Sequence, residues 1–183
     1  MSRLLVISGH PASGKTTLAH RLAKDLGHWP IVSRDTIKEH LFNTLGWDDR
    51  AWSQKLGRAS WELWPWAIEL LMKTHQPLIA ESNFSGPRAG ENLVRLAEQY
   101  GYTCLEIHCV ASPEVLEQRF RDRVVTGLRH PGHQDNHNLD EFVQLFKHPG
   151  VLAGVSPDPI ILSTVSLTED VYEAVRTRIQ GIS

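Results

Sequence analysis

Five short apolar runs alternate with segments in which apolar residues recur at helical spacing. The runs have the length and continuous apolar character of strands that are buried on both faces of a parallel sheet. They span residues 4–8, 30–33, 77–80, 102–110 and 159–163. Strands that alternate with helices predict one α/β domain with a five-stranded parallel sheet and helices on both of its faces.

The segments between these runs predict helices. In the first, over residues 16–26, Leu18 and Leu22 lie on one helix face, and Gly27 provides a left-handed stop. The others are expected over residues 36–45, 48–75, 87–100, 112–125, 140–147 and from 168 onward. Pro65 should kink or split the longest of them, because proline lacks the N–H that a helix interior needs.

The composition is that of an ordinary globular domain. With 41% hydrophobic residues and a formal net charge of −2, the 183-residue chain can bury one substantial core. The near-neutral charge argues against a dedicated nucleic-acid binder. No run approaches the roughly 18 apolar residues of a membrane span, and the start of the chain lacks a signal-peptide pattern. We expect a cytoplasmic protein in which Cys104 and Cys109 are free thiols.

The most specific motif is a glycine-rich loop directly after the first apolar run. Residues 9–16 read G-x-x-x-x-G-K-T between a predicted strand and a predicted helix, which is the context of a phosphate-binding P-loop. Such a loop points backbone N–H groups at phosphate oxygens. Lys15 is expected to reach the β- and γ-phosphates of ATP, and Thr16 to hold Mg²⁺. The predicted nucleotide-binding residues of this loop are Gly9, His10, Pro11, Ala12, Ser13, Gly14, Lys15, Thr16 and Thr17.

Two carboxylates follow predicted strands and should lie at the same edge of the sheet as the loop. Asp35 could hold or deprotonate an attacking hydroxyl group, although an aspartate just before a helix is also a common N-cap. Glu81 could bind Mg²⁺ through water or orient a substrate, or it could be an ordinary polar strand end.

Three arginines near residues 126–138 are candidates for phosphate contacts. Arg119 and Arg123 share a helix face, and Arg129 follows in the loop; a solvated basic face is the alternative. Residues 126–138 show no periodicity and predict a mobile loop. It contains His130, His133 and His137, which we interpret as surface or substrate-facing histidines; a zinc site is a weaker alternative because no further ligand completes it.

Tryptophans crowd the segment between the second and third predicted strands. They occupy positions 47, 52, 61, 64 and 66. Core packing is the default for aromatic residues at helical spacing, while stacking on a planar substrate is the alternative.

Taken together, these motifs resemble a family of small P-loop kinases. The resemblance rests on the motifs GHPASGKTTLA, SRD, ESNF and SPEVLEQRFRDR. The family includes chloramphenicol phosphotransferase, zeta-toxin kinases, gluconate and shikimate kinases and polynucleotide kinases. The resemblance implies an adenylate-kinase-like fold with a lid over about 126–138 and acceptor specificity in about 47–75. It also implies that Asp35 engages the acceptor hydroxyl and that Arg123 or Arg119 contacts phosphates. Polynucleotide kinases carry an arginine where Lys38 stands here.

The sequence therefore predicts an ATP- and Mg²⁺-dependent kinase that acts on a hydroxyl group of a small molecule. Lys15, Asp35, Arg123 and Arg119 are its expected catalytic residues, Arg129 is a further nucleotide contact, and Thr16 and Glu81 are its metal-site residues. Two alternatives remain. One is a 5′-hydroxyl polynucleotide kinase, and the other is a nucleotide-dependent switch that acts through a protein partner.

Overall fold

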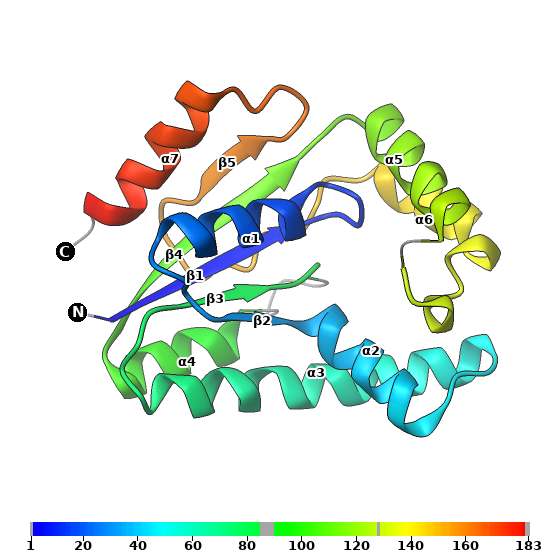
Figure 1. Ribbon diagram of the computed structural model, residues 1–183, viewed down its shortest axis with the longest axis horizontal. Helices are drawn as coiled ribbons and strands as arrows, with labels where there is room; N and C mark the ends of the chain where they lie inside the picture. Colours follow the sequence, from blue (N-terminus) through cyan, green and yellow to red (C-terminus); the bar gives the residue numbers. More distant parts are fainter. Residues whose placement is uncertain (1, 85–89, 128, 182–183) are drawn as a thin grey trace.

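A single five-stranded parallel sheet forms the centre of the molecule. The computed structural model describes residues 2–84, 90–127 and 129–181. The strands are β1 (Ser2–Gly9), β2 (Ile31–Ser33), β3 (Leu78–Glu81), β4 (Tyr102–Val110) and β5 (Ile160–Ser163). Their order in the sheet is β2-β3-β1-β4-β5, and all of their pairings are parallel (Figure 1). The predicted fold class is thus confirmed, with strand limits that differ from the prediction by at most a few residues.

The central strand β1 explains why its sequence is continuously apolar. It pairs with β3 on one side and with β4 on the other, so Leu4 lies opposite both Leu78 and Cys104. Leu4 joins the core on one face of the sheet and Leu5 joins the core on the other, and both are fully buried. A strand in this position has no face turned to water.

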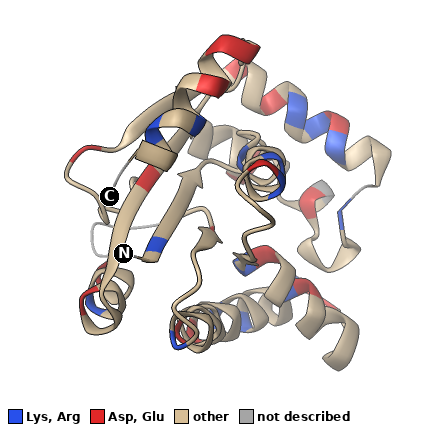
Figure 2. Cartoon of the chain, turned by 60° about the vertical axis from the view of Figure 1, so that its left-hand side comes forward, with Lys and Arg blue, Asp and Glu red and all other residues tan. Residues whose placement is uncertain are grey.

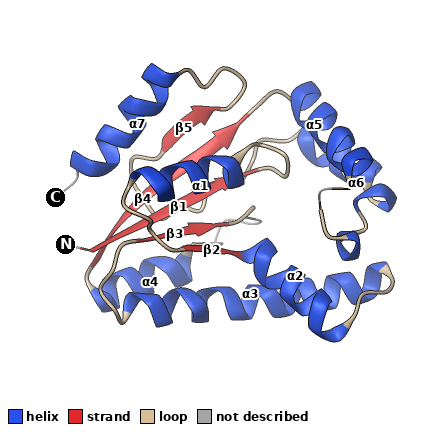
Figure 3. Cartoon of the chain, in the orientation of Figure 1, coloured by secondary structure: helices blue, strands red, loops and turns tan. Residues whose placement is uncertain are grey.

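Helices cover both faces of the sheet (Figure 3). On one face lie α1 (Lys15–Asp25) and α7 (Glu169–Gly181), and on the other lie α3 (Arg50–Met72) and α4 (Glu91–Tyr100). Beyond the carboxyl ends of the strands, α5 (Pro113–Thr126) and α6 (Leu139–Phe146) lie opposite α2 (Arg34–Leu45) (Figure 1). The pair α5 and α6 has a small core of its own around Phe120 and Phe146.

The structure differs from the sequence-based expectations in two places. The helix α3 continues through Pro65 without being split. Trp64 and Ile68, which precede and follow Pro65, are both buried in the core. The free energy gained by this burial exceeds the cost of the hydrogen bond that Pro65 cannot donate. Residues 126–138 contain two short 3₁₀ turns, at Pro131–His133 and Asp135–His137. The predicted helix start at Pro87 lies outside the described residues.

Two smaller expectations concern the cysteines and the membrane. Cys104 and Cys109 are both free thiols, as their spacing along β4 predicts. Within the described part of the chain, every helix is too short or too polar to span a bilayer.

The tryptophan-rich segment divides between the core and the surface. Trp64 is buried, and its indole N–H donates to the carbonyl of Val32 at 2.9 Å. The side chain of Trp61 is partly buried and packs edge-on against Trp64. Trp66 and Trp47, in contrast, are 56% and 52% exposed. Core packing thus accounts for Trp64 and part of Trp61, but not for the other two.

We predict opposite outcomes for two tryptophan substitutions on α3. Trp64→Ala should lower the free energy of unfolding by about 3–5 kcal/mol, because it leaves a cavity in the core and removes the hydrogen bond to the Val32 carbonyl. Trp66→Ala is the matched control and should change it by no more than about 0.5 kcal/mol. Urea denaturation measures both. Equal losses in the two variants would contradict this description of the core.

Candidate active site

A cavity of about 740 Å³ opens at the carboxyl ends of the strands. Its walls come from the glycine-rich loop and α1, the start of α2, the end of β3, α5, the 126–138 segment and the loop after β5. Four of the predicted catalytic side chains line it: Lys15, Asp35, Arg119 and Arg123. Arg129, Thr16 and Thr17 line it as well, together with Pro11, Ala12 and Gly14.

The glycine-rich loop turns tightly from β1 into α1. Gly9 has a φ of 141°, and a Cβ atom there would lie 2.5 Å from the carbonyl oxygen of Cys109. Gly14 has a φ of 85° and is the N-cap of α1, so both glycines occupy conformations that other residues rarely adopt. Lys15 is buried, and its ammonium group lies 3.4 Å from the carbonyl oxygen of His10. The lysine thus folds back over the loop.

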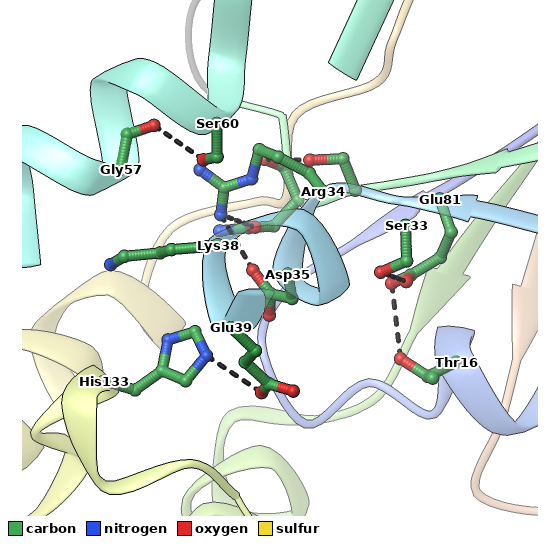
Figure 4. Close-up of polar contacts among 12 residues, drawn as sticks. Thr16, Ser33, Arg34, Asp35, Lys38, Glu39, Gly57, Ser60, Glu81 and His133 are labelled. Carbon is green, nitrogen blue, oxygen red and sulfur yellow. Dashed lines mark hydrogen bonds and ion pairs between the residues drawn. The ribbon is translucent and has the colours of Figure 1, made fainter. Parts of the chain in front are cut away.

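Thr16 and Glu81, the two residues predicted to form a metal site, meet beside this loop. The Thr16 hydroxyl donates to Glu81 Oε1 at 3.3 Å, and Ser33 donates to Glu81 Oε2 at 2.7 Å (Figure 4). Lys15 Nζ lies 3.6 Å from Glu81 Oε1. Glu81 is buried and stands behind Thr16 rather than among the residues that line the cavity.

Asp35 is not the N-cap of its helix, so the alternative explanation for this residue is wrong. Ser33 is the N-cap of α2, and Asp35 lies in its first turn. The Asp35 carboxylate instead accepts from Arg34 at 3.1 Å and from Arg129 at 2.5 Å. Burial favours the protonated form, but Arg129 and Arg34 outweigh it and hold the pKa of Asp35 well below its usual range. Asp35 is therefore ionised at any ordinary pH.

The arginines of α5 and of the 126–138 segment form a connected charge network. Asp135 pairs with Arg123 at 2.9 Å and with Arg129 at 3.2 Å. Through Arg129 this network reaches Asp35. Arg119 instead donates to the hydroxyl and the carbonyl of Thr164, both at 3.0 Å, which ties α5 to the loop after β5.

The three histidines of the 126–138 segment have different environments. His133 is buried and lies 3.0 Å from Glu39, and burial lowers its pKa (Figure 4). It lines the cavity and so is not a surface residue. His130 stacks on Phe42. The zinc alternative finds no support, since the described residues contain no group of three or more His, Cys, Asp or Glu side chains placed to hold a metal ion.

The cavity is strongly cationic although the chain as a whole is not. Eight cationic side chains line it, namely Lys15, Arg21, Arg34, Lys38, Arg50, Arg119, Arg123 and Arg129. Among the described residues, Asp35 and Asp135 are its two carboxylates. Acidic residues elsewhere compensate, and Figure 2 shows both signs of charge on several helices. This excess suits a polyanionic ligand.

Several residues that line the cavity were not identified as site residues from the sequence. Arg34 and Lys38 are one helical turn apart, beside Asp35, and that spacing could have identified them. Asp135 and Thr164 carry no comparable signal, because they reach the site only through folding of the chain.

Comparison with known proteins gives the same architecture. A protein from Chloroflexus aurantiacus j-10-fl described as a "putative kinase" is 30% identical, with a TM-score of 0.86 over 100% of this chain and 99% of that chain. A gluconokinase from Sinorhizobium meliloti 1021 is 14% identical, with a TM-score of 0.57 over 97% and 93%. A shikimate kinase from Bacteroides thetaiotaomicron is 19% identical, with a TM-score of 0.53 over 97% and 96%. The last two share the fold alone. No curated protein matches the sequence.

A sequence model of the AAA domain family matches residues 4–149. This range includes the glycine-rich loop, Asp35, Glu81 and the three arginines. The chain is a small P-loop kinase-like protein, and it belongs to the AAA domain family.

Proposed function

We propose that the protein is an ATP-dependent kinase that transfers the γ-phosphate of ATP to a hydroxyl group of a small molecule. The observation that carries this proposal is the placement of the Asp35 carboxylate in the same cavity as the glycine-rich loop and the arginines of α5. A switch protein also needs the loop, but it has no acceptor hydroxyl group for a carboxylate in this place to engage.

The nucleotide would bind with its phosphates on the glycine-rich loop. The N–H groups at the start of α1 and the ammonium group of Lys15 would face the β- and γ-phosphates. Arg119, Arg123 and Arg129 line the same cavity and would screen the charge that spreads over the γ-phosphoryl oxygens during transfer.

The donor set beside the loop fits Mg²⁺. This ion prefers oxygen ligands and is usually held by one or two carboxylates together with water and substrate phosphates. The Thr16 hydroxyl and the Glu81 carboxylate supply such oxygens 3.3 Å apart. Thr16 would hold the ion directly and Glu81 would hold it through water, and the bound ion would neutralise phosphate charge.

Asp35 would position the acceptor. The acceptor oxygen attacks the γ-phosphorus, the bond from that phosphorus to the β–γ bridging oxygen breaks, and ADP leaves with the electron pair. The hydroxyl proton passes to Asp35 and then to solvent. Since its two arginine partners keep Asp35 ionised, it is a weak base. It therefore acts mainly by accepting a hydrogen bond that holds the hydroxyl in line, and it takes the proton late in a loose transition state.

Lys15→Ala should lower the rate of ATP turnover about 10²- to 10³-fold, because the β- and γ-phosphates lose their buried cation. ADP release measures this rate. Lys24→Ala removes an exposed lysine at the other end of α1 and should leave the rate unchanged. A Lys15→Ala protein that turns over ATP as fast as wild type would refute the proposal.

Asp35→Asn should separate nucleotide binding from transfer. We expect the variant to bind ATP with an affinity within about threefold of wild type, while the stimulation of ADP release by an acceptor falls at least about 10²-fold. The assay uses pooled hydroxyl-bearing metabolites, antibiotics and short oligonucleotides. Unchanged stimulation in the variant would exclude Asp35 from the reaction. Stimulation by oligonucleotides alone, falling steeply with salt, would favour a polynucleotide kinase.

A further inference from the structure

The eight cationic side chains of the cavity differ in their ion-pair partners and in their position around the cavity. Arg21 pairs with Glu169 and Arg50 pairs with Glu141, and neither of these glutamates lines the cavity. Four others lie where a triphosphate would bind. Lys15 follows the glycine-rich loop, Arg119 and Arg123 are on α5, and Arg129 is in the 126–138 segment. Arg34 and Lys38 remain, both on α2 close to Asp35.

Lys38 is a cavity lysine without an acidic partner. Within the described residues it forms no ion pair; its ammonium group donates to the Ser53 hydroxyl at 3.1 Å and lies 5.2 Å from the centre of the Phe42 ring. Burial, then the charge of Arg34, lowers its pKa to about 8, against the opposite influence of Asp35. A cation in such surroundings gains from a bound anion more than a solvated lysine does.

Arg34 is held rigidly beside Asp35 at the wall of the cavity. Its Nη2 donates to Asp35 at 3.1 Å and to Asn83 at 2.9 Å, and its guanidinium group lies over the Trp61 ring at 4.8 Å. The side chain is therefore fixed in place, and it lines the same cavity as Lys38.

We propose that Arg34 and Lys38 form an anion subsite, so that the acceptor is a small molecule that carries a phosphate or carboxylate group close to its reactive hydroxyl. This inference rests on the proposed kinase function. Arg34, Asp35 and Lys38 lie at the start of α2 (Figure 4) and line the same cavity, so that a ligand bound there could contact all three. A neutral alcohol of the same shape would leave Lys38 without a counter-ion and would be rejected for that reason.

Sulfate titration tests the subsite without any transfer reaction. The protein is first saturated with a non-hydrolysable ATP analogue and Mg²⁺, so that the triphosphate site is filled. Sulfate is then added, with chloride at matched ionic strength as the reference, and thermal melting is followed. Wild type should show a saturable rise in melting temperature, and Lys38→Met should require at least about tenfold more sulfate for the same rise.

Two variants control this titration. Lys24→Met removes an exposed lysine of α1 and should respond like wild type. Lys38→Arg keeps the charge and should retain most of the sulfate effect, which guards against a mere loss of packing in Lys38→Met. Equal sulfate responses in wild type and Lys38→Met, or no saturable response in wild type, would overturn the subsite.

Turnover with matched acceptors then tests the substrate class. The pairs are a sugar with its phosphate ester and a hydroxy acid with its amide. The anionic member of at least one pair should stimulate ADP release at least about tenfold more than the neutral one, and Lys38→Met should abolish this preference. The productive pair distinguishes phosphate from carboxylate. Equal use of neutral and anionic members would overturn the inference while leaving the kinase proposal standing. An unimpaired Lys15→Ala protein would refute the kinase proposal while the sulfate titration still decides the subsite.

Discussion

The burial of β1 between two hydrophobic cores is the constraint on which the rest of the structure depends. Because its side chains alternate between the core under α1 and α7 and the core under α3 and α4, the strand can neither slip in register nor turn over. Its last residue, Gly9, lies against the backbone of β4, where a side chain would not fit. The glycine-rich loop therefore starts from a strand that is held on both sides and on both faces.

The parallel arrangement gathers polar groups from distant parts of the chain at one edge of the sheet. Glu81 at the end of β3 meets Thr16 from α1 and Ser33 from β2, and none of the three is a sequence neighbour of another. At the same edge a chain of net charge −2 concentrates a large cationic excess. Net charge is therefore a poor guide to the electrostatics of this cavity, because the compensating acids lie outside it.

The sequence predicts best those features that depend on residues close together along the chain. The glycine-rich loop and β4 depend on neighbouring residues, so motif and apolar pattern sufficed, and β4 spans the predicted residues 102–110. The expectation that Pro65 splits the helix was wrong, because contacts of Trp64 with the sheet offset the cost of the backbone hydrogen bond that proline cannot donate. The pairing of Asp35 with Arg129 spans 94 positions along the chain. The spacing of apolar residues along the chain does not predict such a pair. It also does not predict that His133 is buried.

The ion pair between Arg129 and Asp35 has a consequence for binding. A hydroxyl group that donates to Asp35 can share the carboxylate with Arg129, because each carboxylate oxygen can accept more than one hydrogen bond. The same guanidinium also pairs with Asp135, so it connects the α2 side of the cavity with the 126–138 segment. A ligand that strengthens or weakens the pair with Asp35 would therefore also change how firmly that segment is held, which would couple the two sides of the cavity.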